Sequence, residues 1–280
     1  MSEPIIDTHL HLWHPEAGHY QWLAGAPDML NRPYELDDSA EDRAGLGITG
    51  AVLVQADDDD ADTEAMLAVA EASPEVMGVV GYVPLHEPDV AVARLAELHS
   101  RPALVGIRNL IHDRPDPDWV LRPDVTEGLA LVERAGLPFD LVTNRARHLD
   151  HIPTLGERFG DLTLVIDHLG KPPIGESVGQ ERWREQMRIA ASNPKVVAKL
   201  SGLYGPDSTP VGTDELRGWI ATALELFGPD RLMVGSDWPV SELAGGYRTV
   251  TAQVLDLVAE LAGSQAPAIL SGTARRTYGL

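Results

Sequence analysis

The residues PIIDTHLHLW occupy positions 4–13, where a short apolar run leads directly into two histidines. A short apolar run with polar residues beyond it is typical of a parallel strand that is covered on both faces. Seven further runs of this kind follow, and each is succeeded by a longer amphipathic stretch. The alternation predicts repeated β-α units around a parallel sheet, which is the α/β class.

The predicted strands number eight, and they cover residues 4–9, 51–56, 77–83, 104–109, 138–143, 162–167, 196–201 and 231–236. The predicted helices cover residues 35–46, 63–72, 88–100, 124–135, 149–158, 180–191, 214–226, 247–261 and 267–276. Eight strands alternating with helices predict a single-domain (β/α)₈ TIM barrel over residues 1–280. An open doubly wound sheet is the alternative, and the absence of a G-x-G-x-x-G turn after the first strand counts against its dinucleotide-binding form.

The composition restricts the class of partner. The chain has 280 residues, 44% of them hydrophobic, a formal net charge of -21 and no cysteine. Such a charge repels nucleic acid and anionic membranes, so we expect a small-molecule substrate and neither of those partners. Without cysteine there is no disulfide or thiolate nucleophile, and no signal peptide or membrane span is evident, which predicts a cytoplasmic protein. Whether it forms a homo-oligomer is left open.

The acidic run Asp57–Asp60, together with Asp62, lies after the second predicted strand and before a predicted helix. Carboxylates at that position cap the helix N-terminus and compensate its dipole. We therefore interpret the run as structural.

Polar side chains stand at the ends of five predicted strands. In a barrel of this type the reactive groups lie where strands end on the C-terminal face. We therefore expect these side chains to converge on one mouth: His9, His11, Arg108, Asn109, Asp167, His168, Lys199, Ser201, Ser236 and Asp237.

Five of these residues are candidate catalytic groups. His9 and His11 project from the same side of an extended segment because side chains alternate with period two. A partly desolvated Asp237 can have a raised pKa and act as a general base, although a helix N-cap is the alternative. The Arg108 fork can bind a carbonyl or an oxyanion, and its alternative is a structural ion pair. His168 follows a strand directly, and its alternative is a role in loop hydrogen bonds.

A second set of residues is predicted to contact the substrate. Tryptophan rings that follow strand ends can stack on a sugar ring, and polar side chains there can bind its oxygens. The set comprises Trp13, Asn109, His148, Lys199 and Trp238.

The motifs IIDTHLHLW, AVLVQA, GVVGYV, LVGIRNLIHDRPDPDWVLRPDV, FDLVTNRARHL, LVIDHLGKPPI, AKLSG and RLMVGSDWPV occur in that order. In this order they resemble the amidohydrolase-related family of TIM-barrel hydrolases that includes fuconolactonase, rhamnonolactonase and pyrone-dicarboxylate lactonase. The likeness covers nearly the whole chain, and it is specific for the family rather than for the substrate. It implies a water that attacks a lactone carbonyl, with Asp237 as base and with His9, His11, His168 and Arg108 polarising the carbonyl.

Two departures from the wider amidohydrolase pattern bear on metal binding. No lysine ends the fourth predicted strand, and no histidine ends the seventh, which argues against a binuclear centre. Four groups can still hold one Zn²⁺ with water, namely His9, His11, His168 and Asp237. Similar lactonases work without metal, so a zinc enzyme and a metal-independent enzyme both stay open. Asn109 stands where many of these lactonases have histidine, which leaves the substrate subclass open.

Two other functions compete with a sugar-acid lactonase. A metal-dependent decarboxylase is the first, because relatives in the broader family use the same H-x-H pair, and the missing histidine on the seventh strand counts against it. A non-catalytic barrel that only binds a sugar acid is the second. The combined set of histidines and Asp237 favours catalysis.

Overall fold

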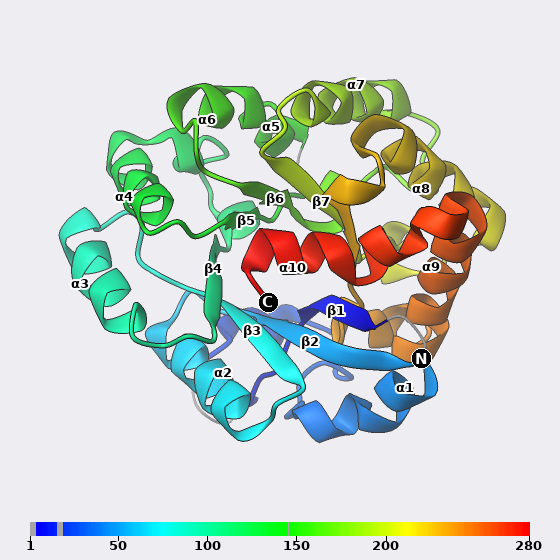
Figure 1. The fold of residues 1–280 in the computed structure, drawn as a ribbon, viewed down its shortest axis with the longest axis horizontal. Helices are drawn as coiled ribbons and strands as arrows, with labels where there is room; N and C mark the ends of the chain where they lie inside the picture. Colours follow the sequence, from blue (N-terminus) through cyan, green and yellow to red (C-terminus); the bar gives the residue numbers. More distant parts are fainter. Residues whose placement is uncertain (1–3, 16–18, 145) are drawn as a thin grey trace.

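The computed structural model describes residues 4–15, 19–144 and 146–280, and it shows one sheet of parallel strands in chain order (Figure 1). Leu10 also pairs in parallel with Trp238 beyond the last strand, so the sheet curls into a nearly closed barrel. The predicted TIM barrel is therefore confirmed. Its strands are β1 (Ile5–Leu10), β2 (Ile48–Val54), β3 (Val76–Gly81), β4 (Leu104–Asn109), β5 (Phe139–Leu141), β6 (Leu164–Ile166), β7 (Val196–Leu200) and β8 (Leu232–Val234).

Helices surround the strands in the expected alternation, and none of those in the described part of the chain has the length and apolar character needed to cross a membrane. They are α1 (Ala40–Gly45), α2 (Asp60–Ala72), α3 (Pro88–Leu98), α4 (Pro123–Arg134), α5 (Ala146–Leu149), α6 (Ile152–Arg158), α7 (Gln180–Ala191), α8 (Thr213–Phe227), α9 (Tyr247–Ala262) and α10 (Thr273–Tyr278). The predicted helix 149–158 is wrong in one respect, because α5 ends at Leu149 and a separate helix begins at Ile152.

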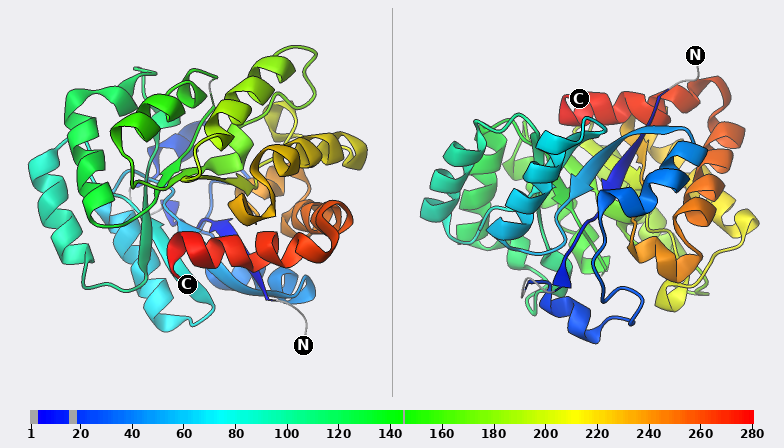
Figure 2. Two further views of the ribbon diagram at one scale, coloured as in Figure 1. Left: turned by 45° about the horizontal axis from the view of Figure 1, so that its top comes forward. Right: turned by 90° about the horizontal axis from the view of Figure 1, so that it is seen from below.

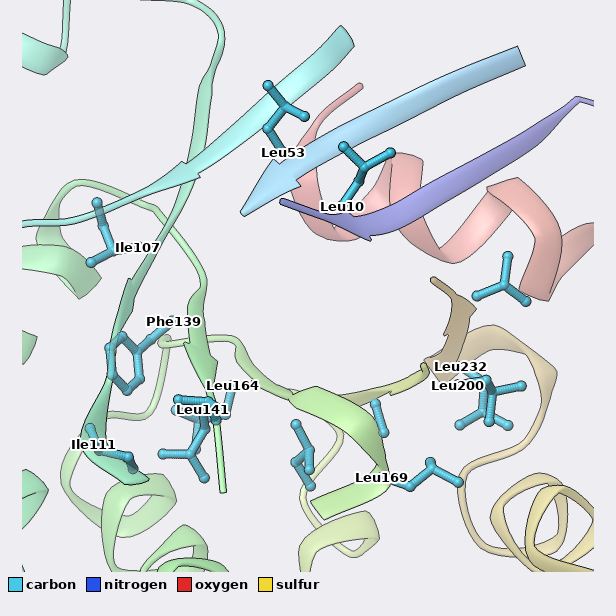
Figure 3. Packing of buried hydrophobic residues seen from close by; sticks show 14 of the residues in the cluster. Leu10, Leu53, Ile107, Ile111, Phe139, Leu141, Leu164, Leu169, Leu200 and Leu232 are labelled. Carbon is cyan, nitrogen blue, oxygen red and sulfur yellow. The ribbon is translucent and has the colours of Figure 1, made fainter. Parts of the chain in front are cut away.

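The strand side chains divide into two apolar layers because successive residues point to opposite faces. Leu53, Ile107 and Phe139 belong to the large cluster that packs between the strands and the outer helices (Figure 3). Val52 and Val54, on either side of Leu53, belong to a smaller cluster with residues from β1, β3, β4, β6, β7, β8 and α10. The barrel interior is therefore filled with side chains below the mouth, which leaves its C-terminal end for a site.

Helix α10 lies across the end of the barrel at which β1 begins (Figures 1 and 2). It carries Tyr278 into the interior, where the phenol hydroxyl donates to Asp140 Oδ2 at 2.8 Å. Asp140 also pairs with the buried Lys199. The barrel therefore contains a polar column beneath its mouth, built from residues of β5, β7 and α10.

A second buried carboxylate ties the two ends of the chain together. Asp7 Oδ1 accepts from the backbone N–H groups of His9 and Ser236, and Asp7 Oδ2 accepts from the Tyr247 hydroxyl. Burial raises the pKa of this carboxyl, while these hydrogen bonds oppose the shift. Asp7 thus closes the seam between β1 and the segment after β8.

The acidic run has the predicted helix-capping role and an additional one. Asp59 caps α2 by accepting from the Ala61 N–H at 2.7 Å, as expected. Asp58 accepts from the Leu110 N–H at 2.8 Å, and Asp62 accepts from the Tyr20 hydroxyl and the Ala56 N–H. The run therefore also joins loops at the mouth of the barrel.

We expect Asp62→Asn to change how stability depends on pH. Burial raises the pKa of Asp62 to about 6 from 3.8. Folding therefore favours the protonated form of this carboxyl. The stability that the protonated carboxyl contributes is lost as pH rises from about 4 through about 6. An asparagine keeps a neutral side chain that can accept from Ala56 and donate to Tyr20. The variant should gain about 3 kcal/mol relative to the wild type between pH 4 and pH 7. Urea unfolding at several pH values measures the difference, and a difference that is constant with pH would contradict this expectation.

Candidate functional site

A cavity of about 200 Å³ opens at the C-terminal ends of the strands, and we call it the mouth pocket. Its walls come from the segments that follow β1, β2, β4, β5, β6 and β8. The lining residues are His11, Trp13, Trp22, Ala56, Arg108, Leu110, His112, Val142, Thr143, Asn144, His168, Lys171, Asp237 and Val240.

The expected convergence of side chains at the mouth is found for four of the five predicted catalytic residues. His11, Arg108, His168 and Asp237 all line the mouth pocket. His9 is completely buried beneath them, and its ring centroid lies 4.5 Å from that of His168. His9 therefore contacts the other groups at the site from below the pocket.

Three imidazole Nε2 atoms gather around one carboxylate oxygen. Asp237 Oδ1 lies 3.5 Å from the Nε2 atom of His11 and 3.8 Å from those of His9 and His168. The Nε2 atoms of His9 and His11 are 3.1 Å apart. Because all these atoms can act as acceptors, their convergence requires a proton or a cation among them.

The Nδ1 atoms of His11 and His168, which are the ring nitrogens that do not face Asp237, are held by hydrogen bonds. His11 Nδ1 donates to the Val54 carbonyl oxygen at 2.7 Å, which leaves its Nε2 atom as an acceptor in the neutral ring. His168 Nδ1 lies 2.9 Å from the Ser201 hydroxyl. These contacts fix the ring orientations, as partners of metal-binding or catalytic histidines do.

The backbone at the site adopts an unusual conformation that points these side chains into the pocket. His168, Lys171 and Asp237 have φ values of 55°, 53° and 55°, in the left-handed region that non-glycine residues seldom adopt. Such residues cost of order 1–3 kcal/mol each and cluster at functional sites. The strain at three lining residues supports a functional role for the pocket.

The pKa of Asp237 shifts in the opposite direction to the one predicted. Burial alone would raise it, but His168, His11 and Lys171 outweigh burial and hold the pKa well below the usual range of an aspartate. Burial lowers the pKa of His168 to about 3, so that ring is neutral at pH 7. The ammonium group of Lys171 therefore helps to keep Asp237 ionised. The expectation of a raised pKa for Asp237 is wrong, because the sequence pattern does not reveal that His168, His11 and Lys171 lie beside this carboxylate.

Arg108 forms the structural ion pair that was the alternative reading of its position, and it also lines the mouth pocket. Its Nη1 atom donates to Asp167 Oδ2 at 3.0 Å, and its Nη2 atom donates to the Gln55 carbonyl oxygen, so the guanidinium is held in a buried ion pair. Its Nε atom has no hydrogen-bond partner within the described ranges, although the side chain lines the pocket.

Most of the residues that were predicted to contact the substrate do not line the mouth pocket. Trp13 lines the mouth pocket, with its indole N–H donating to the Leu30 carbonyl oxygen. Asn109 is buried and donates to the Val83 carbonyl oxygen, while Trp238 is buried and donates to Glu242. Neither Asn109 nor Trp238 lines the mouth pocket, and the Asn109 amide nitrogen and the Trp238 indole nitrogen donate to groups within the protein.

Lys199 and His148 are also absent from the wall of the mouth pocket within the described residues. Lys199 is wholly buried, and its Nζ atom lies 2.5 Å from Asp140 Oδ2 and 3.2 Å from Asp167 Oδ1. His148 is buried on α5 and is not among the residues around the pocket in the described structure. Neither side chain therefore belongs to the pocket wall in the part of the chain that the structure describes.

The sequence pattern did not identify Thr143, Asn144 and Lys171 as polar residues that line the mouth pocket. Thr143 and Asn144 follow β5, and Lys171 follows the turn after His168. The places of Thr143 and Asn144 just beyond the end of β5 are the signal that could have found these two residues, because the same rule identified the histidines. They give this side of the pocket a hydroxyl, an amide and an ammonium group.

The donor set fits one divalent cation. One ligand atom from each of His9, His168 and Asp237 lies within 4.8 Å of the others, and all three residues are buried. The Nε2 atom of His11 is also close to this group. Nitrogen and carboxylate donors in this number suit a metal such as zinc, which is usually four-coordinate in proteins.

Comparison with known proteins identifies the family. The family model described as amidohydrolase matches residues 6–280. The chain belongs to the amidohydrolase family. This assignment confirms the resemblance seen in the ordered motifs.

Curated relatives of this amidohydrolase include two lactonases. L-fucono-1,5-lactonase of Burkholderia ambifaria is 34% identical over 242 residues, which cover 86% of this chain and 82% of that protein. L-fucono-1,5-lactonase of Burkholderia multivorans is 32% identical and covers 98% of this chain and 96% of its own length. A crystal structure of a zinc-bound amidohydrolase from Burkholderia multivorans superposes with a TM-score of 0.89 at 32% identity and covers 99% of each chain.

Proposed function

We propose that this amidohydrolase is a lactonase that hydrolyses a small sugar-acid lactone in the mouth pocket. The observation that carries the proposal is the buried Asp237 carboxylate, which three imidazoles surround at the base of the pocket. The similarity to two L-fucono-1,5-lactonases over more than four fifths of the chain supports an aldonolactone as the substrate.

In the proposed reaction Asp237 takes a proton from a water molecule whose oxygen attacks the lactone carbonyl carbon. Arg108 donates a hydrogen bond to the carbonyl oxygen, where negative charge develops. The tetrahedral adduct then collapses, the bond from the carbonyl carbon to the ring oxygen breaks, and Asp237 returns its proton to that oxygen. Because its surroundings favour the ionised form, the protonated Asp237 is a good acid, so one carboxylate serves both steps.

We further propose zinc as the divalent metal that suits the site, held by His9, His168 and Asp237 with His11 as the fourth candidate ligand. Such a metal supplies Lewis-acid polarisation of a carbonyl or a water of lowered pKa. The zinc-bound structural neighbour supports this choice of metal. The hydrogen bonds of His11 and His168 orient their rings in either state of occupancy.

Proton release tests the proposed function and the metal requirement together. A pH indicator follows the acid formed when aldono- and aldarolactones are supplied to metal-free enzyme and to enzyme loaded with Zn²⁺. We expect the metal-free enzyme to hydrolyse at least one aldonolactone, because Asp237 and Arg108 are already in place. If only the Zn²⁺-loaded enzyme hydrolyses a lactone, the histidines are instead metal ligands that the reaction requires.

The same assay addresses the competing functions. If no lactone reacts in either state, the lactonase proposal fails, and release of carbon dioxide from carboxylated substrates becomes the next measurement. If lactones raise the melting temperature but are not hydrolysed, the barrel only binds them, since a ligand that favours the native state stabilises it.

A further inference from the structure

The mouth pocket continues past two of its lining residues into a second cavity. Asn144 and Lys171 line both the mouth pocket and an adjoining cavity of about 440 Å³, which we call the side cavity. The walls of the side cavity come from the segments that follow β5, β6 and β7 and from α7. A ligand whose reacting end lies beside Asp237 can therefore extend past Asn144 and Lys171 into the side cavity.

Lys171 differs in its surroundings from the other two lysines of the chain. The Nζ atoms of Lys199 and Lys195 lie 2.5 Å and 3.7 Å from an aspartate oxygen. Within the described ranges Lys171 forms no ion pair. Its Nζ atom lies 3.5 Å from the Gly202 carbonyl oxygen and 5.7 Å from the centroid of the Tyr204 ring. The Lys171 ammonium therefore stands at the junction of the two cavities without a carboxylate in direct contact.

The other charged groups of the side cavity favour the junction as the place for an anion. Arg182 donates to Asp150 Oδ2 at 2.9 Å, so its charge is already compensated. Glu176 lines the side cavity but not the mouth pocket, and Asp237 lines the mouth pocket but not the side cavity. Lys171 lines both, so an anionic group is best placed at the junction, where it contacts the ammonium and avoids both carboxylates.

The wall that follows β5 offers polar groups next to this ammonium. Thr143 is completely buried and lines the mouth pocket, and its hydroxyl has no hydrogen-bond partner in the part of the chain that the structure describes. A buried hydroxyl without a partner is costly, and a hydroxyl of the substrate can satisfy it. The Asn144 amide follows directly along the chain. The wall therefore suits a polyhydroxylated ligand that carries an anionic group.

We propose that Lys171 binds a second carboxylate of the substrate, so that the enzyme accepts lactones of dicarboxylic sugar acids as well as neutral aldonolactones. With the ester carbonyl beside Asp237, the carboxylate at the other end of the carbon chain lies at the junction. There the Lys171 ammonium and the Asn144 amide donate hydrogen bonds to it, and hydrogen bonds between charged groups are the strong ones. The inference rests on the proposed lactonase function and extends its substrate range.

A matched pair of lactones tests the role of Lys171. The 1,4-lactones of gluconic and glucaric acid share one ring, and a CH₂OH group in the first is a carboxylate in the second. Proton release gives kcat/KM for both in the wild type, in Lys171→Met and in Lys195→Met, whose exposed lysine lines neither cavity. Lys171→Met should lower the ratio of the glucarolactone value to the gluconolactone value at least about tenfold. The Lys195 variant should leave the ratio unchanged, and lactone pairs of other configurations follow the same design.

The ratio separates recognition of the carboxylate from other effects of Lys171. Because this lysine also helps to keep Asp237 ionised, its loss can slow both lactones, but that effect is common to the pair and cancels. An unchanged ratio in Lys171→Met overturns the inference and leaves the lactonase proposal in place. A wild type that hydrolyses aldonolactones but no aldarolactone has the same meaning. If the wild type hydrolyses no lactone of either kind, the lactonase proposal itself fails, and this inference fails with it.

Discussion

Asp237→Asn should lower kcat for lactone hydrolysis at least about 10³-fold while the barrel stays folded, since general-base catalysis contributes about 10²–10⁴-fold and the same carboxylate also returns the proton. The amide has nearly the same shape as the carboxylate but cannot take a proton from water. Its backbone hydrogen bond to the His9 carbonyl oxygen is retained. Steady-state kinetics and circular dichroism measure the two parts of this prediction.

The control for this variant is Asp214→Asn on α8, where the side chain is almost fully exposed and distant from the pocket lining. It removes the same charge from the molecule and should leave kcat unchanged. An Asp237→Asn enzyme with wild-type turnover would eliminate this residue as the base. Loss of the folded state in that variant would instead assign Asp237 a structural role.

Gly202→Ala should lower kcat at least about 100-fold, which is the order of loss that a misplacement of about 1 Å causes at an active site. A Cβ atom here would lie 2.5 Å from His168 Nδ1 and 2.8 Å from Asp237 Oδ2, so both groups must shift. Gly202 also has a φ of 56°, where an alanine costs about 1–2 kcal/mol of stability. Kinetics and thermal unfolding measure the two effects.

Gly47→Ala is the control that separates the steric clash of an added Cβ atom from the cost of a positive φ. Gly47 has a φ of 72°, but no atom lies within 4 Å of the position that its Cβ would occupy. Both alanine variants should therefore lose stability, and only Gly202→Ala should lose activity. Equal kcat values in the two variants would contradict the close approach of Gly202 to the catalytic groups.

The sequence predicted the barrel and much of the site for one physical reason. In parallel β-α units the polar residues that follow apolar runs are brought together at the C-terminal end, whatever their separation along the chain. His11, Arg108, His168 and Asp237 could be found by that rule. The Trp13 position could be found in the same way.

The sequence pattern did not give the positions of Lys199 and Lys171 correctly, and the physical causes are equally definite. Lys199 ends a predicted strand, but its side chain points into the barrel, where its partner Asp140 comes from a strand that is 59 residues away in the chain. That pairing leaves no signal in the local pattern of either strand. Lys171 reaches the pocket because the backbone turns through positive φ values at His168 and Leu169, which neither residue type favours. Local propensity cannot anticipate such a turn.

The hydrogen bonds of Asp7 have a consequence for synthesis of the chain on the ribosome. Two of the partners that satisfy this carboxylate, the Ser236 N–H and the Tyr247 hydroxyl, follow it by 229 and 240 residues. Until they emerge, a nascent chain cannot bury β1 without depriving the Asp7 carboxyl of two of its three hydrogen bonds. We therefore expect the first strand to stay solvated until the segments that carry Ser236 and Tyr247 have been synthesised. The barrel then closes late, through contacts of long sequence separation, which are slow to form.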